Sequence, residues 1–149
     1  MATIHLPPDF KDFLQLLHSE RVEYLLVGGY AVGYYGYPRA TGDMDIWIAA
    51  TPDNAERIVR VLRAFGFAAK TVSPELFLEQ GRVVRMGMPP MRIELITSAS
   101  GVEFEQCYTD RKVDIVDGVE VSVISLEHLK RNKRAAARAK DFDDLENLP

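Results

Sequence analysis

The sequence predicts an α/β (α+β) fold in which helices flank a small mixed β-sheet and the C-terminus is helical. Segments with the 3.6-residue spacing of amphipathic helices alternate with short apolar or strictly alternating runs that are typical of strands. Glycine and proline lie between many of these segments. Because no repeat or flexible linker divides the 149 residues, we expect a single domain over residues 1–149, since domains usually have about 100–200 residues.

The chain begins with a predicted helix, a strand and a second helix. Two prolines precede apolar residues at helical spacing, which are Phe10, Phe13, Leu14, Leu16 and Leu17. Residues 23–27 form an apolar run that ends at two glycines, as expected of a buried strand. Residues 30–35 resume a helical pattern, which Gly36 and Pro38 end.

A strand with two different faces and a third helix are expected next. Residues 43–49 alternate between an apolar face and a second face, the first with Met44, Ile46 and Ile48 and the second with Asp43, Asp45 and Trp47. Thr51 is a candidate N-cap, and Pro52 suits the first helical position. The apolar pattern of this helix ends at Gly66.

Four more strands and the C-terminal helical region complete the predicted order. The apolar runs 83–88 and 91–96 lie on either side of two prolines, and both are expected to be strands. Residues 112–116 and 119–123 are typical of a hairpin around an Asp-Gly turn. Ser125 is a cap-like residue at the start of a helical composition that continues towards residue 148.

The overall composition argues against several classes of protein. The 18 Lys and Arg are outnumbered by 22 Asp and Glu, so a broad basic surface for nucleic acid is not expected. Cys107 is the one cysteine and cannot form an internal disulfide, which suits a reducing cytosol. No stretch approaches the roughly 20 apolar residues of a membrane span. We therefore expect a cytoplasmic protein that does not associate with membranes.

Two carboxylates on the alternating strand are candidates for a metal site. Asp43 and Asp45 are two positions apart, so both side chains would point to one face, about 7 Å apart along the strand. Their mutual repulsion would be relieved by a divalent cation that prefers oxygen ligands, such as Mg²⁺ or Mn²⁺. The alternative is a solvated edge strand with two exposed acids.

Two glycines before these carboxylates are candidates for phosphate binding. Gly28 and Gly29 lie between a predicted strand and a predicted helix, where backbone N–H groups and the helix dipole favour an anion. The absence of side chains lets a phosphate approach the backbone closely. The alternative is that Gly29, Gly33 and Gly36 only permit close packing of the helix.

These residues together resemble the signature of a known superfamily. The pattern Gly28-Gly29-x-Ala31-x4-Gly36-x2-Arg39-x-Thr41-x-Asp43-x-Asp45 is similar to that of minimal nucleotidyltransferases in the DNA polymerase-β-like superfamily. The resemblance is greatest to a bacterial branch that includes abortive-infection and toxin–antitoxin nucleotidyltransferases. It implies the nucleotidyltransferase fold over nearly the whole chain.

The resemblance also implies roles for individual residues. The triphosphate of an NTP would lie on the glycine turn, and the residues expected to bind nucleotide in this region are Gly28, Gly29, Tyr30, Arg39 and Thr41. Many relatives have Ser, Thr or His where this chain has Tyr30. The family implies a third metal-binding carboxylate on a later strand, and we assign it to Glu94, which apolar residues flank. The alternative for Glu94 is an outward-facing position on a half-exposed strand.

A second similarity to the same branch lies near the C-terminus. The pattern Lys133-x4-Arg138-x-Lys140-Asp141-x2-Asp144 implies that this segment lies against the nucleotide site. Lys133, Arg138, Lys140 and Asp141 are therefore added to the candidate nucleotide-binding residues. The alternative is a solvated helix stabilised by pairs such as Lys140 with Asp144, each contributing only about 0.2–0.5 kcal/mol.

The resemblance implies a metal-dependent transfer of NMP from an NTP to a hydroxyl group, with Asp43, Asp45 and Glu94 as the catalytic residues. The acceptor class stays open among RNA or tRNA, protein and small molecules, and the resemblance suggests a toxin–antitoxin or phage-defence role. A chain of this length has little room for an acceptor domain, so a homodimer or a partner protein is expected to complete the site. The alternative function is a non-catalytic nucleotide-binding or partner-binding module, such as an antitoxin-like subunit.

Overall fold

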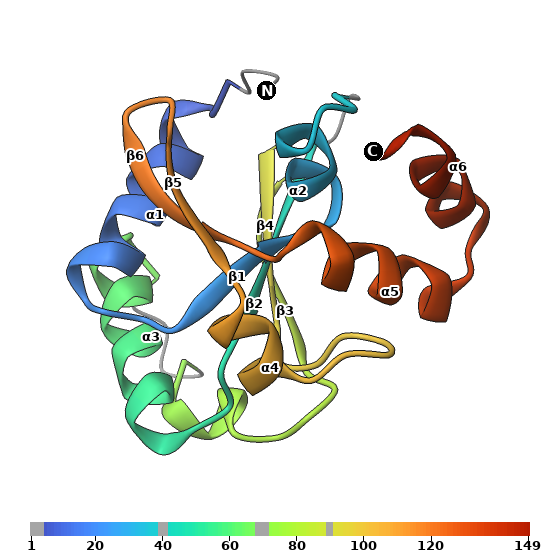
Figure 1. Cartoon of the computed structure of the whole chain (residues 1–149). Coiled ribbons are helices and arrows are strands. Elements are labelled where there is room, and N and C mark those ends of the chain that lie inside the picture. Colours follow the sequence, from blue (N-terminus) through green and yellow to red (C-terminus); the bar gives the residue numbers. More distant parts are fainter. Residues whose placement is uncertain (1–4, 39–41, 68–71, 89–90) are drawn as a thin grey trace.

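The computed structural model describes residues 5–38, 42–67, 72–88 and 91–149, and it contains a six-stranded mixed sheet flanked by helices (Figure 1). The strands are β1 (Tyr24–Val27), β2 (Asp43–Ile48), β3 (Val83–Met88), β4 (Met91–Ile96), β5 (Lys112–Val116) and β6 (Val119–Val123). The helices are α1 (Pro8–Ser19), α2 (Gly28–Tyr34), α3 (Pro52–Ala64), the 3-10 helix η1 (Pro74–Phe77), α4 (Phe104–Thr109), α5 (Leu126–Ala136) and α6 (Ala139–Asn147). The predicted fold class is confirmed.

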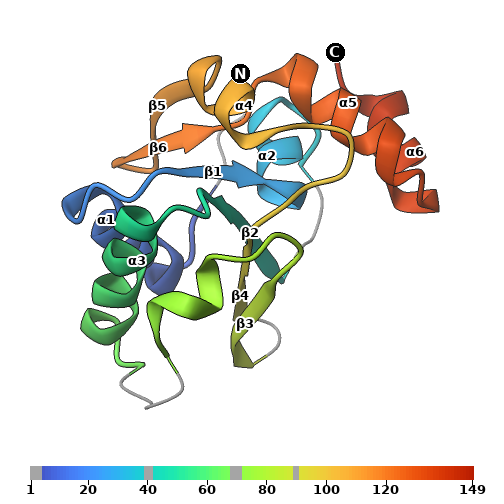
Figure 2. The ribbon, with the colours of Figure 1, turned by 90° about the horizontal axis from the view of Figure 1, so that it is seen from below.

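The sheet has the strand order β3-β4-β2-β1-β6-β5, with β2 and β1 at its centre. Strand β2 is antiparallel to β1 and parallel to β4, and β3 is antiparallel to β4. Helices α1 and α3 pack together at one side of the molecule, whereas α5 and α6 lie at the opposite side (Figures 1 and 2). The central strands therefore lie between the N-terminal helices and the C-terminal helical pair.

The apolar face of β2 is part of the hydrophobic core. Met44, Ile46 and Ile48 are fully buried, as their alternation predicts, and so are four of the apolar residues of α1 that recur at helical spacing, whereas Leu16 is partly buried. Each such side chain contributes roughly 1.5–3 kcal/mol when it leaves water. This burial determines which way β2 faces, because a shift of one residue would turn Asp43 and Asp45 into the core.

The register between β2 and its neighbours determines which polar side chains meet. Asp43 pairs with Arg92, and Asp45 pairs with Glu94, across the parallel strands β2 and β4. Arg85 on β3 pairs with Glu94 from the other side. Paired residues of adjacent strands point to the same face of a sheet. The register thus gathers acidic and basic side chains on the face opposite the core residues of β2.

The C-terminal helical region that the sequence predicts is present as two helices. It begins at Ser125, whose side chain accepts a hydrogen bond from the His128 N–H. Helix α5 ends at Ala136, and Ala137 adopts a left-handed conformation with φ 54° before α6 begins. Elements α4 and η1 have no counterpart among the predicted elements, because four to six residues are too few to show helical periodicity.

Helix α2 begins two residues earlier than expected, at Gly28 itself. None of the helices in the described ranges combines the length and the apolar character needed to cross a membrane.

Candidate functional site

A cavity of about 560 Å³ lies where the centre of the sheet meets the C-terminal helices. It brings together most of the residues that the sequence singles out, which are Gly28, Gly29, Asp43, Asp45, Glu94, Lys133, Arg138 and Lys140. They come from three segments that are far apart in the sequence. Ser98, Ser100, Asn132 and Arg85 also line the cavity.

The turn between β1 and α2 requires glycine at its first position. Gly28 has φ +66°, a conformation that glycine adopts without strain. A side chain at Gly28 would also collide with the carboxylate of Asp45, which lies directly against it. The glycine therefore permits a close approach between the turn and the acidic strand.

The surroundings of Asp45 disfavour its charged form. Burial, a hydrogen bond with Glu94 and the negative charges of Glu94 and Asp43 raise the pKa of Asp45 well above its usual range, and only the charge of Lys140 opposes them. The three carboxylates are thus close enough to repel one another. Because β2 is a central strand, Asp43 and Asp45 do not lie on the solvated edge strand that was the alternative interpretation.

Two arginines neutralise part of this acidic cluster. Arg92 donates two hydrogen bonds to Asp43, from Nε to Oδ1 at 3.2 Å and from Nη2 to Oδ2 at 3.0 Å. Its Nη2 also lies 3.7 Å from Glu94 Oε1. Arg85 donates from Nε to Glu94 Oε1 at 2.9 Å, and its side chain is 60% exposed. Glu94 is thus held between Arg85, Arg92 and Asp45.

Arg85 and Arg92 belong to the site but are not among the residues that the sequence predicts for it. Arg92 is two positions before Glu94, so it lies on the same face of its strand. That alternation could have placed Arg92 beside Glu94, but not beside Asp43. The second contact depends on β4 pairing with β2, which the spacing of residues does not specify.

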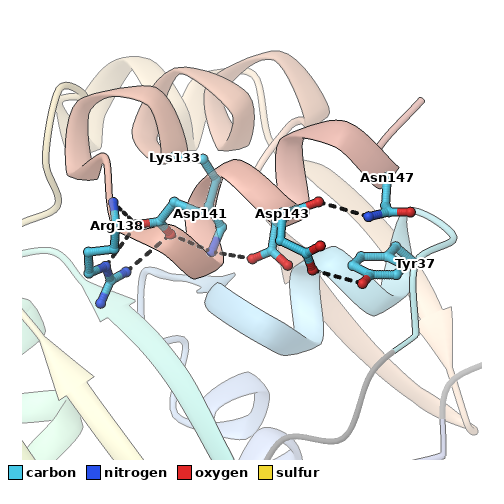
Figure 3. A network of polar contacts seen from close by, with 7 residues as sticks. Tyr37, Lys133, Arg138, Asp141, Asp143 and Asn147 are labelled. Atoms are coloured by element: carbon cyan, nitrogen blue, oxygen red, sulfur yellow. Dashed lines mark hydrogen bonds and ion pairs between the residues drawn. The ribbon is translucent and has the colours of Figure 1, made fainter.

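The C-terminal residues separate into buried and exposed groups. Lys133 Nζ lies 3.1 Å from Asp141 Oδ1 and 2.9 Å from Asp144 Oδ2, and all three side chains are at most 4% exposed (Figure 3). Arg138 and Lys140 are exposed at the edge of the cavity. Lys133 lines the cavity as well, although its ammonium is engaged by the two aspartates.

Tyr30, a further candidate, does not line the cavity. Tyr30 is 9% exposed and packs edge-to-face on Phe10, with ring centroids 5.6 Å apart, in the core rather than in the cavity lining. Arg39 and Thr41 lie outside the residues that the structure describes.

A second cavity of about 370 Å³ adjoins the first and shares Ser98 with it. Its lining includes the aromatic rings of Trp47 and Phe104, which contact each other edge-to-face, and the acids Glu103 and Glu105. Trp47 is 2% exposed, as core packing predicts, and it follows Asp45 on the same face of β2. The acidic and aromatic lining suits a ligand that has positive charge and a ring surface.

The donor set of the first cavity suits a hard divalent cation. Asp43, Asp45 and Glu94 offer carboxylate oxygens, the ligands that Mg²⁺ prefers. In the described part of the chain, no three acidic, histidine or cysteine side chains are already arranged as metal ligands. At this site Asp43 is paired with Arg92, and Glu94 is paired with Arg85. The three carboxylates are suitable ligands for a cation. In this structure two of them are paired with arginines.

The chain is similar to a known protein family and to solved structures. The model of the aminoglycoside-2''-adenylyltransferase family matches residues 9–148. A provisionally assigned nucleotidyltransferase from Thermotoga maritima has a similar structure, with a TM-score of 0.58 and 15% identity over 90% of this chain and 86% of that one. An antigenic nucleotidyltransferase-like protein from Paracoccidioides brasiliensis has a TM-score of 0.53 and 20% identity over 89% of this chain and 70% of that one. No curated protein sequence matches significantly.

Proposed function

Because the chain belongs to the aminoglycoside-2''-adenylyltransferase family, within the nucleotidyltransferase superfamily, we propose that it is a metal-dependent enzyme that transfers NMP from an NTP to a hydroxyl group. One observation carries the proposal. The glycine turn, the acidic cluster and the exposed basic side chains of Arg138 and Lys140 line one cavity, although they come from distant parts of the sequence. Such an arrangement matches the needs of phosphoryl transfer, in which positioned charge does most of the catalysis.

Asp43, Asp45 and Glu94 are the residues proposed to hold Mg²⁺ or Mn²⁺. When bound, the cation would neutralise phosphate charge and lower the pKa of the acceptor hydroxyl. Burial, a hydrogen bond with Glu94 and the negative charges of Glu94 and Asp43 raise the pKa of Asp45, and this supports the assignment, since a bound cation would stabilise the charged carboxylate. Arg92 and Arg85 would release Asp43 and Glu94 as these carboxylates turn to the ion.

The other residues of the cavity have roles that follow from their chemistry. Gly28 and Gly29 are proposed to present backbone N–H groups to phosphate oxygens, and Arg138 and Lys140 to supply positive charge to the same cavity. The acceptor oxygen attacks the α-phosphorus, the bond from that phosphorus to the bridging oxygen breaks, and pyrophosphate leaves. Glu94 is proposed to accept the hydroxyl proton.

The acceptor is proposed to be a cationic, polyhydroxylated small molecule, with ATP as the donor. The name of the matched family indicates adenylyl transfer to an aminoglycoside. The adjoining cavity supports the same class of acceptor, because Glu103 and Glu105 would attract amino groups, whereas they would repel the phosphates of RNA. Its half-buried Phe104 ring offers surface for a sugar ring.

The decisive experiment is incubation of the protein with each α-labelled NTP, Mg²⁺ or Mn²⁺, and one of three acceptors: an aminoglycoside panel, total cellular RNA or total protein. The expected result is label from ATP on the aminoglycoside. Label on RNA instead would move the function to the acceptor that the sequence resemblance suggests, with its toxin–antitoxin or phage-defence role.

Two variants serve as controls. Asp43→Asn combined with Asp45→Asn should abolish transfer, whereas Asp53→Asn, an exposed carboxylate on α3, should leave it unchanged. If no acceptor is labelled, but wild-type protein binds ATP only with Mg²⁺, the protein is the non-catalytic nucleotide-binding module. Equal labelling by the wild type and the double variant would refute the metal-dependent enzyme.

A further inference from the structure

Helix α6 is attached to its neighbour by an ionic core rather than an apolar one. Its buried residues include Asp141 and Asp144, and the ammonium of Lys133 on α5 lies between their carboxylates. Removing three charged groups from water is costly, and buried ion pairs add little net stability compared with apolar packing. A buried pair can, however, specify one arrangement of two elements. The ionic core formed by Lys133, Asp141 and Asp144 is therefore suited to fixing the position of α6 against α5.

Asp141 uses both of its oxygens to connect this core to Arg138. Lys133 donates to Oδ1 at 3.1 Å, while the Arg138 backbone N–H and Nε donate to Oδ2 at 3.1 Å and 2.7 Å (Figure 3). Arg138 Nη2 also donates to Oδ1 at 3.3 Å. Burial alone would raise the pKa of Asp141, but these donors outweigh it and hold the pKa at about 2. The carboxylate therefore stays charged at neutral pH and accepts hydrogen bonds from one edge of the guanidinium.

The other edge of the guanidinium remains available at the cavity. Arg138 lines the cavity, its side chain is 59% exposed, and it is close enough to feel the charge of Asp45. A guanidinium has five N–H groups, of which Asp141 engages two. The remaining donors suit the paired oxygens of a phosphate group.

The turn before Arg138 is also held in an unusual conformation. Ala137 has φ 54° and ψ 32°, the left-handed region that residues with a Cβ rarely adopt. Its N–H donates to the carbonyl of Lys133, which closes the end of α5. The ionic core on both sides of Ala137 keeps this strained turn in place and directs Arg138 back towards the sheet.

We propose that Asp141 is a positioning residue that, anchored by Lys133, holds the guanidinium of Arg138 ready for the phosphate oxygens of a bound nucleotide. This inference rests on the proposed function, because it assigns how the same cavity recognises its nucleotide. An unrestrained arginine would lose side-chain freedom on binding, whereas one already held by Asp141 loses less. Lys133, Asp141 and Asp144 accordingly act through Arg138 and do not contact the ligand.

The test is a double-mutant cycle on ligand affinity, measured by calorimetry with ATP and Mg²⁺ and, separately, with inorganic tripolyphosphate. Arg138→Gln and Asp141→Asn should each weaken binding of both ligands by about tenfold, the effect of losing one charge-assisted contact. The combined variant should bind no more weakly than Arg138→Gln alone, because Asp141 acts through Arg138. Additive losses, or wild-type affinity in Asp141→Asn, would overturn the positioning role.

Further variants separate this role from a loss of folding and from a failure of the proposed function. Asp143→Asn changes an exposed acid on the same helix, which accepts a hydrogen bond from Tyr37, and it should bind both ligands normally (Figure 3). Arg138→Lys keeps the charge but loses the two-point contact with Asp141, so it should bind as weakly as Arg138→Gln. If Arg138→Lys binds as the wild type does, the positioning role is wrong even if Asp141→Asn fails to fold.

The proposed function has its own control in this experiment. If ATP binding requires Mg²⁺ and both Asp43 and Asp45, yet the Asp141→Asn protein binds normally, only the positioning role fails. If wild-type protein binds neither ATP nor tripolyphosphate, the proposed function and the positioning role are both wrong.

Discussion

Arg92 and Asp43 occupy paired positions on β4 and β2, and the guanidinium donates two hydrogen bonds to the carboxylate, at 3.2 Å and 3.0 Å. Arg92 thus neutralises a residue that we propose as a metal ligand. A cation that binds Asp43 must compete with this contact, which leads to the first prediction.

Arg92→Gln is expected to tighten Mn²⁺ binding and to lower the stability of the metal-free protein. The variant leaves Asp43, Asp45 and Glu94 without their nearest shared counter-ion, so their attraction for a cation increases. We expect an increase of about threefold in Mn²⁺ affinity, consistent with a partly exposed ion pair, measured by titration of the electron paramagnetic resonance signal. Arg82→Gln removes an exposed arginine that pairs with Glu79 and should have no effect. Weaker Mn²⁺ binding in Arg92→Gln would contradict competition.

Glu94→Gln is expected to weaken ligand binding without lowering the stability of the protein. The change removes the negative charge that contributes to the raised pKa of Asp45, while the lost pair with the exposed Arg85 contributes little. The melting temperature of the metal-free protein should therefore stay the same or rise, whereas Mg²⁺-dependent ATP binding should weaken about tenfold. Thermal denaturation and calorimetry measure the two effects, with Glu79→Gln as the exposed control. A large fall in stability would identify Glu94 as a structural residue instead.

Gly28→Ala should destabilise the protein more than Gly118→Ala. Both glycines have a positive φ, +66° and +82°, so alanine pays a conformational cost of roughly 1–2 kcal/mol at each. The space around Gly118 is open, whereas a Cβ on Gly28 would collide with Asp45. Urea denaturation of the two variants gives the difference in the free energy of unfolding. Equal losses would show that the turn moves away from Asp45 at little cost.

The charged core between α5 and α6 predicts a particular loss of stability in acid. The folded-state pKa of Asp141, about 2, lies below its usual value near 3.8, so the unfolded chain takes up a proton first. The stabilisation is complete above about pH 4 and is lost as the pH falls towards 2. It amounts to something on the order of 2 kcal/mol. Asp141→Asn should flatten the dependence of the unfolding free energy on pH in this window, and Asp143→Asn should keep it.

Much of this architecture follows from local spacing in the sequence. Apolar residues at helical spacing predict α1 and α3, and strict alternation predicts both the strand β2 and the shared face of Asp43 and Asp45. These features are local because the backbone repeats of helix and strand determine them. The glycine turn before α2 is predicted for the same reason.

The contacts that define the cavity depend on tertiary structure. The pairing of β4 with β2 brings Glu94 to Asp45 and Arg92 to Asp43. The alternation of residues within a strand does not determine which other strand it pairs with. The left-handed Ala137 turns α6 back, so that Lys133 and Asp141 become a buried pair while Arg138 and Lys140 reach the cavity. The sequence alone does not distinguish Lys133 from Arg138 and Lys140. Burial distinguishes them, because only folding determines which charges leave water and which remain available to a ligand.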